Sequence, residues 1–109
     1  MNRDEIPPGT LYLLVLKALG LRGELHGYEI AEFIEHSSDN VLQVEEGSLY
    51  PALQRMLIKG WVTAKWGVTA GNRRARYYQL TAAGRKQLAV ELSQFERVIG
   101  AVTRVIQTA

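Results

Sequence analysis

The side chains best suited to chemistry in this 109-residue sequence are positively charged and gathered in its middle. Between Gly47 and Val90 every charged residue is basic, whereas the residues before Gly47 include three basic and nine acidic side chains. A block of one sign, inside a chain whose net charge is only +2, indicates a polyanionic partner such as nucleic acid. The basic residues of this block are Arg55, Lys59, Lys65, Arg73, Arg74, Arg76, Arg85 and Lys86.

The densest part of the block is Arg73, Arg74 and Arg76, which follow Asn72 in a segment with the composition of a turn. A run of charges is usually a solvated face, and exposed charges add little to stability. Three arginines without an acidic neighbour are poorly explained in that way. We therefore predict that they contact DNA, through phosphates or a narrow minor groove.

A second group of candidates lies on a predicted helix earlier in the block. Arg55 and Lys59 are one turn apart, so they share a helix face from which they can reach phosphates or guanine edges. The alternative for both is a solvated surface. The hydroxyl and amide side chains in this region can also bind phosphates or bases, so the predicted DNA contacts include Ser48, Tyr50, Gln54 and Tyr28. The alternative for these residues is a structural role or a place on the polar surface.

No arrangement of residues predicts catalysis, a metal site or a cofactor. The sequence contains no nucleophile with a base at a recognisable spacing, no Walker sequence and no G-x-G-x-x-G sequence. Carboxylates and imidazoles are also not spaced as a metal-ligand set. The residues weighed for such roles, and interpreted instead as helix surface, helix ends and loops, are Glu29, Glu32, Glu35, His26, His36, Gly67 and Gly71.

Composition is most simply explained by a reducing compartment. The sequence has no cysteine, which excludes disulfides and thiolate metal sites. Its longest apolar run, Leu11 to Leu16, is far shorter than the roughly 20 residues that cross a bilayer, and the first residues do not resemble a secretory signal. We expect a soluble cytoplasmic protein with no membrane partner.

The candidate residues must be positioned by helices and one hairpin. Apolar periodicity and expected N-caps at Thr10, Ser48 and Thr81 define the helices, with Pro51 in the first turn of the third and Gly60 at its end. Residues 20–27, rich in glycine, read as a connection, and residues 41–44 as a short strand or an extended link. The predicted helices cover about 10–19, 28–36, 47–59 and 81–107, and the hairpin strands cover 61–66 and 74–80.

Aromatic residues alternate along the predicted hairpin. They could form stacking platforms for single-stranded nucleic acid. Aromatics on a hairpin more often pack a sheet against its neighbours, and one face here must cover the third helix. We therefore expect sheet packing for Trp61, Trp66, Tyr77 and Tyr78.

Three short helices followed by a hairpin predict the winged form of the helix-turn-helix, in which the third helix enters the major groove. The fold class is mainly α with a small β-hairpin, plus a long C-terminal helix. Residues 1–80 form the predicted DNA-binding domain, and residues 81–109 form a dimerisation helix within the same structural unit. The basic block covers both the third helix and the hairpin, the two elements that such a fold presents to a duplex.

The last helix carries a heptad seam, which predicts a homodimer. Its apolar residues recur at alternating steps of four and three, while the first helix is apolar around nearly its whole circumference and should pack both inside its subunit and against a partner. The predicted dimer interface comprises Leu11, Leu14, Val15, Leu88, Leu92, Phe95, Ile99, Val102 and Ile106.

Spaced motifs in the chain resemble those of PadR-like transcriptional regulators. The run Gly47-Ser48-Leu49-Tyr50-Pro51-Ala52-Leu53 is similar to the family's G-[TS]-L-Y-P-x-L signature. His26-Gly27-Tyr28-Glu29-Ile30 is similar to the start of its second helix, and Tyr77-Tyr78-Gln79-Leu80-Thr81-Ala82-Ala83-Gly84 to the exit from its wing. The resemblance extends from about Gly9 to Gln107, and a single helix after the wing is typical of the family's short branch.

The resemblance implies a regulator rather than an enzyme: a homodimer that binds double-stranded DNA at an inverted-repeat operator and represses transcription. In PadR-like proteins an aromatic residue of the last helix can also line a ligand pocket between subunits, which implies a small aromatic effector near Phe95. The heptad explains Phe95 without a ligand. The alternative function is a winged helix used only for protein interaction, because a fold does not determine a function.

Overall fold

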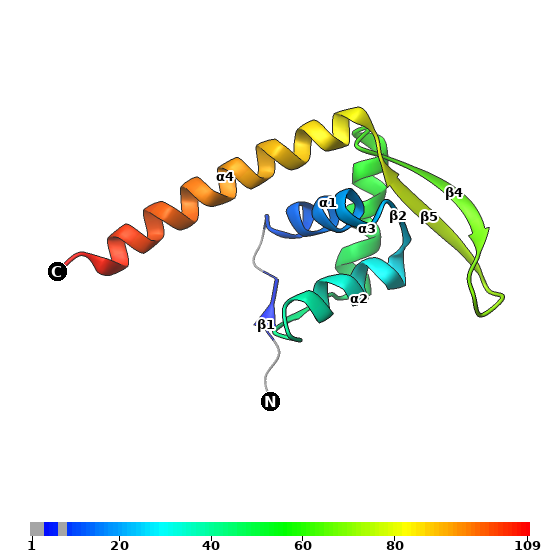
Figure 1. Cartoon of the computed structure of the whole chain (residues 1–109), viewed down its shortest axis with the longest axis horizontal. Helices are drawn as coiled ribbons and strands as arrows, with labels where there is room; N and C mark the ends of the chain where they lie inside the picture. Colours follow the sequence, from blue (N-terminus) through cyan, green and yellow to red (C-terminus); the bar gives the residue numbers. More distant parts are fainter. Residues whose placement is uncertain (1–3, 7–8) are drawn as a thin grey trace.

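The computed structural model describes residues 4–6 and 9–109. The described part of the chain contains four helices and a small sheet at one side of them, from which a hairpin projects, and a second pair of short strands lies near the N-terminus (Figure 1). The mainly helical fold class with a small β-sheet and a long last helix is confirmed. In chain order the elements are β1 (Asp4–Glu5), α1 (Leu11–Arg22), β2 (Glu24–His26), α2 (Gly27–Ser37), β3 (Leu42–Gln43), α3 (Glu46–Ile58), β4 (Val62–Val68), β5 (Arg74–Leu80) and α4 (Ala82–Gln107).

Helix α1 forms the centre of the core, as its apolar circumference predicts. It contacts α2, α3, α4 and β5, and five of its side chains are buried. The prediction of its end at Leu19 was wrong: the helix continues to Arg22, and Gly20 lies inside it, where a Cβ would meet Leu88 of α4 at 3.0 Å. Glycine here permits close approach of α4. Thr10 occupies the N-cap position as expected, but its side chain makes no capping hydrogen bond.

The sheet has one strand more than the hairpin predicted from the sequence. Strands β4 and β5 pair antiparallel from Val62↔Leu80 to Val68↔Arg74, and β2 adds to the free edge of β5. Strand β2 falls in the segment predicted to be a connection. Three residues are too few to show a strand period, and their pairing partners lie more than 50 positions away in the chain.

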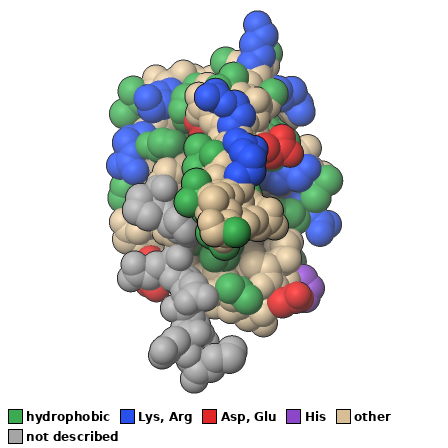
Figure 2. All heavy atoms as spheres, turned by 90° about the vertical axis from the view of Figure 1, so that its left-hand side faces the viewer, with side chains coloured by type: hydrophobic (Ala, Val, Ile, Leu, Met, Phe, Trp, Pro, Cys, Tyr) green, Lys and Arg blue, Asp and Glu red, His purple; other side chains and the backbone are tan. Residues whose placement is uncertain are grey.

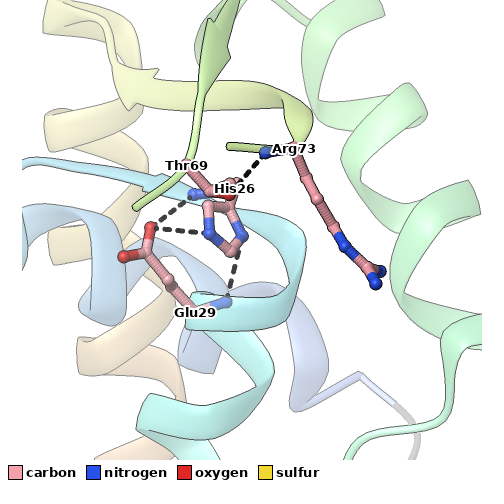
Figure 3. A network of polar contacts seen from close by, with 4 residues as sticks. All are labelled: His26, Glu29, Thr69 and Arg73. Atoms are coloured by element: carbon pink, nitrogen blue, oxygen red, sulfur yellow. Dashed lines mark hydrogen bonds and ion pairs between the residues drawn. The ribbon is translucent and has the colours of Figure 1, made fainter. Parts of the chain in front are cut away.

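Helix α2 begins with a capping box that closes on β2. The backbone N–H of His26 donates to Glu29 Oε1 (3.1 Å), and the N–H of Glu29 donates to His26 Nδ1 (3.4 Å), as Figure 3 shows. Because Nδ1 is the acceptor, a neutral imidazole is required for this cap. Residues 41–44, expected to form a short strand or an extended link, contain strand β3, which pairs in parallel with β1.

Helix α3 starts earlier than predicted. Glu45, not Ser48, occupies the N-cap position, and Pro51 lies in the second turn rather than the first. The core face of the helix agrees with its predicted stripe, since Leu49, Leu53 and Met56 are buried. The helix ends at Ile58, and Gly60 follows with φ 76°, a left-handed conformation that glycine adopts without strain.

The junction between the hairpin and α4 is held by Thr81. Its Oγ1 accepts the N–H of Gly84 (3.0 Å) and donates to the carbonyl of Gly60 (2.6 Å), so the predicted cap is confirmed. Helix α4 then passes over α1 and continues beyond it, away from the hairpin (Figure 1). The molecule is therefore elongated, with extents of 57 × 37 × 21 Å.

Gly84 at this junction has no room for a side chain. A Cβ at Gly84 would overlap the backbone carbonyl oxygen of Trp61, and a backbone atom cannot turn aside. We expect Gly84→Ala to destabilise the fold by about 2 kcal/mol and to lower the Tm by about 10 °C. Thermal unfolding followed by circular dichroism measures both.

The matched control is Gly100→Ala in the same helix, where a Cβ meets nothing nearer than 3.6 Å. Alanine has the higher helix propensity, so this variant should keep or raise the Tm. Equal losses at the two glycines would contradict the close approach of α4 to Trp61.

Candidate nucleic-acid interface

The outward side of α3 presents most of the residues predicted to bind DNA. Ser48, Tyr50, Gln54, Arg55 and Lys59 are all exposed, while the opposite side of the helix is buried in the core. This division follows from the helical period of the apolar residues. These exposed residues lie on two flanks of the helix, and each flank contacts different neighbouring elements.

Tyr50 lies on the flank that packs against the start of α2. A Cβ at Gly27 would come within 2.9 Å of its hydroxyl oxygen, so glycine at the first position of α2 makes room for the tyrosine ring. The next residue, Tyr28, is 70% exposed, and its ring stacks on that of His26 at 6.3 Å between centroids. Both tyrosines predicted to contact DNA therefore lie at the junction of α2 and α3.

Arg55 and Lys59 occupy the other flank, where each cation lies over an aromatic ring. Arg55 Nε donates to the hydroxyl of Tyr12, and its guanidinium lies 5.7 Å from the centre of that ring. Lys59 Nζ lies 5.2 Å from the centre of the Trp61 ring, which packs edge-on against Tyr12. Their predicted common face is confirmed. The contribution of Tyr12 was missed, because it lies 43 residues from Arg55 in the sequence.

The hairpin extends beyond the core, and its free end is basic. Strand register places Trp66 directly opposite Arg76, and Val68 opposite Arg74. Side chains two residues apart in a strand share a face, so these four belong to one face. The base of the same face is buried through Val62, Tyr78 and Leu80. One face of the sheet is therefore buried in the core at its base and exposed to solvent at its free end.

Trp66 corrects the expectation that all four hairpin aromatics pack the sheet. It is 58% exposed and lies outside the hydrophobic core. Its ring instead faces cations, with Arg74 Cζ at 4.4 Å and Arg76 Cζ at 5.9 Å from its centre. The expectation fails because the hairpin continues past the helices that cover its base. Tyr78 is buried as expected, and Trp61 and Tyr77 are half-buried.

The turn of the hairpin holds Arg73 by its backbone alone. Thr69 N–H donates to the carbonyl of Arg73 (2.8 Å), and Arg73 N–H donates to Thr69 Oγ1 (3.2 Å). Asn72 supplies the left-handed residue of the turn, with φ 61°. The side chain of Arg73 extends away from these hydrogen bonds (Figure 3). Its charge is thus presented to solvent by a closed turn.

The cations on this surface have almost no acidic partners. Lys65 is the exception: it lies on the other face of the hairpin and pairs with Glu24 at 3.1 Å. Within the described residues, no carboxylate pairs with the cations of α3 or of the hairpin turn. Burial raises the pKa of the Tyr78 hydroxyl, an effect that the nearby Arg76 partly opposes, so this tyrosine stays neutral at physiological pH.

The acidic residues of α2 have structural roles or lie on its surface. Glu29 closes the capping box, and Glu35 Oε2 accepts the N–H of Val44 (2.9 Å), which ties β3 to α2. In the described part of the chain no three His, Asp or Glu side chains are grouped to hold a metal ion, and no helix is long and apolar enough to span a membrane.

Helix α4 exposes most of its predicted heptad seam. Phe95 is 40% exposed and Ile106 is 76% exposed, and Leu92, Ile99 and Val102 lie between these values. Figure 2 shows hydrophobic side chains uncovered between Lys and Arg side chains on the end of the molecule from which α4 projects. A row of large apolar residues in water is unusual for a monomer and is typical of an interaction surface.

The predicted interface residues of α1 differ in what they can offer a partner. Val15 is completely buried within its own subunit, so its inclusion in the dimer interface was wrong. The reason is that α1 lies at the centre of the core and its inward side faces other elements of the same chain. Leu11 and Leu14 of α1, and Leu88 of α4, are half-buried against that core and keep part of their surface free.

Comparison with known proteins gives the same reading of the fold. The model of the family described as "Transcriptional regulator PadR-like family" matches residues 15–90, which include α3 and the hairpin. A transcriptional regulator from Clostridium thermocellum superposes with a TM-score of 0.81 at 24% identity, covering 91% of this chain and 95% of that one.

Two further solved structures are similar. A PadR-like transcriptional regulator from Bacillus cereus superposes with a TM-score of 0.76 at 25% identity, covering 93% of this chain and 95% of that one. PadR from Bacillus subtilis, solved in complex with operator DNA, superposes with a TM-score of 0.65 at 24% identity, covering 75% of this chain and 46% of that one.

Proposed function

Because this chain belongs to the PadR-like family of transcriptional regulators, we propose that it is a homodimeric repressor that binds an inverted-repeat operator. The family and its structural neighbours are transcriptional regulators, not enzymes. In the proposed complex α3 enters the major groove and the hairpin follows the adjacent backbone. DNA contacts are assigned to Ser48, Tyr50, Gln54, Arg55, Lys59, Arg73, Arg74, Arg76 and Tyr28.

The observation that carries this proposal is the unpaired positive charge on α3 and the hairpin. Arg55, Lys59 and the three hairpin arginines are exposed, and no carboxylate of the described residues neutralises them. Such a surface attracts the phosphates of a duplex and releases their counterions on binding. Support also comes from Bacillus subtilis PadR, which shares this fold and has been solved on its operator.

The proposal of a dimer rests on α4. Its exposed seam would be covered by the same seam of a second copy, with α1 contributing at the edges. A twofold axis through this seam pairs two α3 helices, and successive major grooves on one side of a duplex lie about 34 Å apart. An inverted repeat with half-sites one helical turn apart is the matching operator.

The first test is an anisotropy titration and a mobility shift with DNA from upstream of the protein's own gene. If the five cations assigned to DNA in each subunit all contact phosphate, a dimer makes about ten such contacts and the slope of log K against log salt is about −9. Affinity then falls about 10⁵-fold between about 50 and 200 mM salt.

A flat salt dependence would contradict this mode of binding, and no binding even at low salt would favour the protein-interaction module. Repeating the shift with small aromatic compounds tests whether Phe95 also contacts an effector.

A further inference from the structure

We propose that Trp66 is a positioning residue of the DNA-binding hairpin, which holds the guanidinium groups of Arg74 and Arg76 ready for the phosphates of a duplex. This inference rests on the proposed function and deepens it. It assigns a role to an exposed aromatic that neither the core nor the dimer seam explains.

Geometry places all three side chains on one face of the hairpin. Trp66 and Arg76 are opposite each other in the β4–β5 register, and Arg74 is two residues along the same strand face. Both guanidinium carbons lie within 6 Å of the indole centre, the nearer at 4.4 Å. These distances are those of favourable contacts between a cation and the face of an aromatic ring.

An indole orders an arginine without neutralising it. A carboxylate would also fix the guanidinium, but it would cancel the charge and repel phosphate. The hairpin shows that arrangement on its other face, where Lys65 pairs with Glu24. The cations Arg55 on α3 and Lys59 at its C-cap likewise lie over Tyr12 and Trp61. Aromatic support of unpaired cations is thus a repeated feature of the predicted DNA-binding surface.

Ordering in the free protein should raise affinity. A long side chain that becomes fixed only on binding lowers affinity by about two- to tenfold through lost rotamer freedom. Two arginines already held over Trp66 avoid most of that loss. Removing the ring should therefore weaken binding by about tenfold without removing any charge.

The probe is a fluorescein-labelled duplex of about 20 base pairs and arbitrary sequence, because phosphate contacts do not depend on sequence. We expect Trp66→Leu to bind about tenfold more weakly than the wild type with the same salt slope. Trp66→Phe keeps an aromatic face and should recover most of the loss. The control Val68→Ala trims another exposed apolar residue of the same face and should leave affinity within about twofold.

A double-mutant cycle distinguishes positioning from direct contact. In a background of Arg74→Ala and Arg76→Ala, Trp66→Leu should have no further effect on affinity, because the ring then has nothing to hold. Additive losses would show that Trp66 itself touches DNA and would overturn the inference. So would unchanged affinity of Trp66→Leu in the intact protein. If the wild type fails to bind any duplex at low salt, the proposed function fails instead. Thermal melts of each variant check that the fold is intact.

Discussion

Replacing Arg73, Arg74 and Arg76 together with alanine is expected to reduce affinity for duplex DNA by about a hundredfold or more near 100 mM salt. A dimer loses six cations in this variant, so the slope of log K against log salt should become shallower by about 5. The fold should survive, because the turn is held by backbone bonds and by Thr69 Oγ1 rather than by the arginine side chains. Anisotropy titrations over a range of salt concentrations measure both quantities.

The matched control removes three exposed cations elsewhere, Lys17 on α1 and Arg97 and Arg104 on α4. It changes the net charge by the same amount and should alter affinity only a few-fold, because charges more than a Debye length from the duplex are screened. An equal loss in the control would mean that net charge, not the hairpin, determines binding. A third variant with lysine at the three arginine positions should keep the salt slope, since lysine keeps the charge.

The second large effect is expected at the centre of the α4 seam, where Ile99→Asp should separate the dimer. Ile99 is 46% exposed in the single chain, so aspartate there does not disturb the subunit core. In a dimer the same position would bury a charge without a partner, which is strongly unfavourable. A monomer reaches only one half-site, and affinity for the operator should fall by about a hundredfold or more because the second contact is no longer intramolecular.

Light scattering after gel filtration gives the oligomeric state, and a mobility shift with the upstream DNA gives the loss of binding. The control is Ser93→Asp, an exposed position on the polar side of the same helix, which should remain dimeric and bind normally. If Ile99→Asp stays dimeric, the subunits associate through another surface and the proposed operator geometry must be revised.

The features that the sequence predicted well are those with local signals. The last helix begins after its Thr81 cap and ends at Gln107 as expected, because its cap and apolar period lie within the helix itself. Strand β5 also occupies its predicted residues, because its alternating pattern lies within the strand itself. The core face of α3 also agrees with its period, although the helix begins at Glu46, after an N-cap at Glu45 rather than at Ser48.

The features that the sequence did not predict depend on residues far apart in the chain. Strand β2 exists because β5 offers it an edge, and Arg55 is held because α1 brings Tyr12 to it. The burial of Val15 and Trp66 differs from expectation. Val15 is enclosed by neighbouring elements of its own subunit, and Trp66 lies beyond the helices that cover the base of the hairpin.

By itself the sequence determined most of the helical and extended segments, the positions of the cations along the chain, and the family to which it belongs. Periodicity, capping and charge are properties of short stretches, so they can be read without coordinates. Only the tertiary structure decided which apolar residues are enclosed and which ring each cation faces. Both depend on how far one element extends past its neighbour, and that distance is fixed by packing between segments that are distant in the sequence.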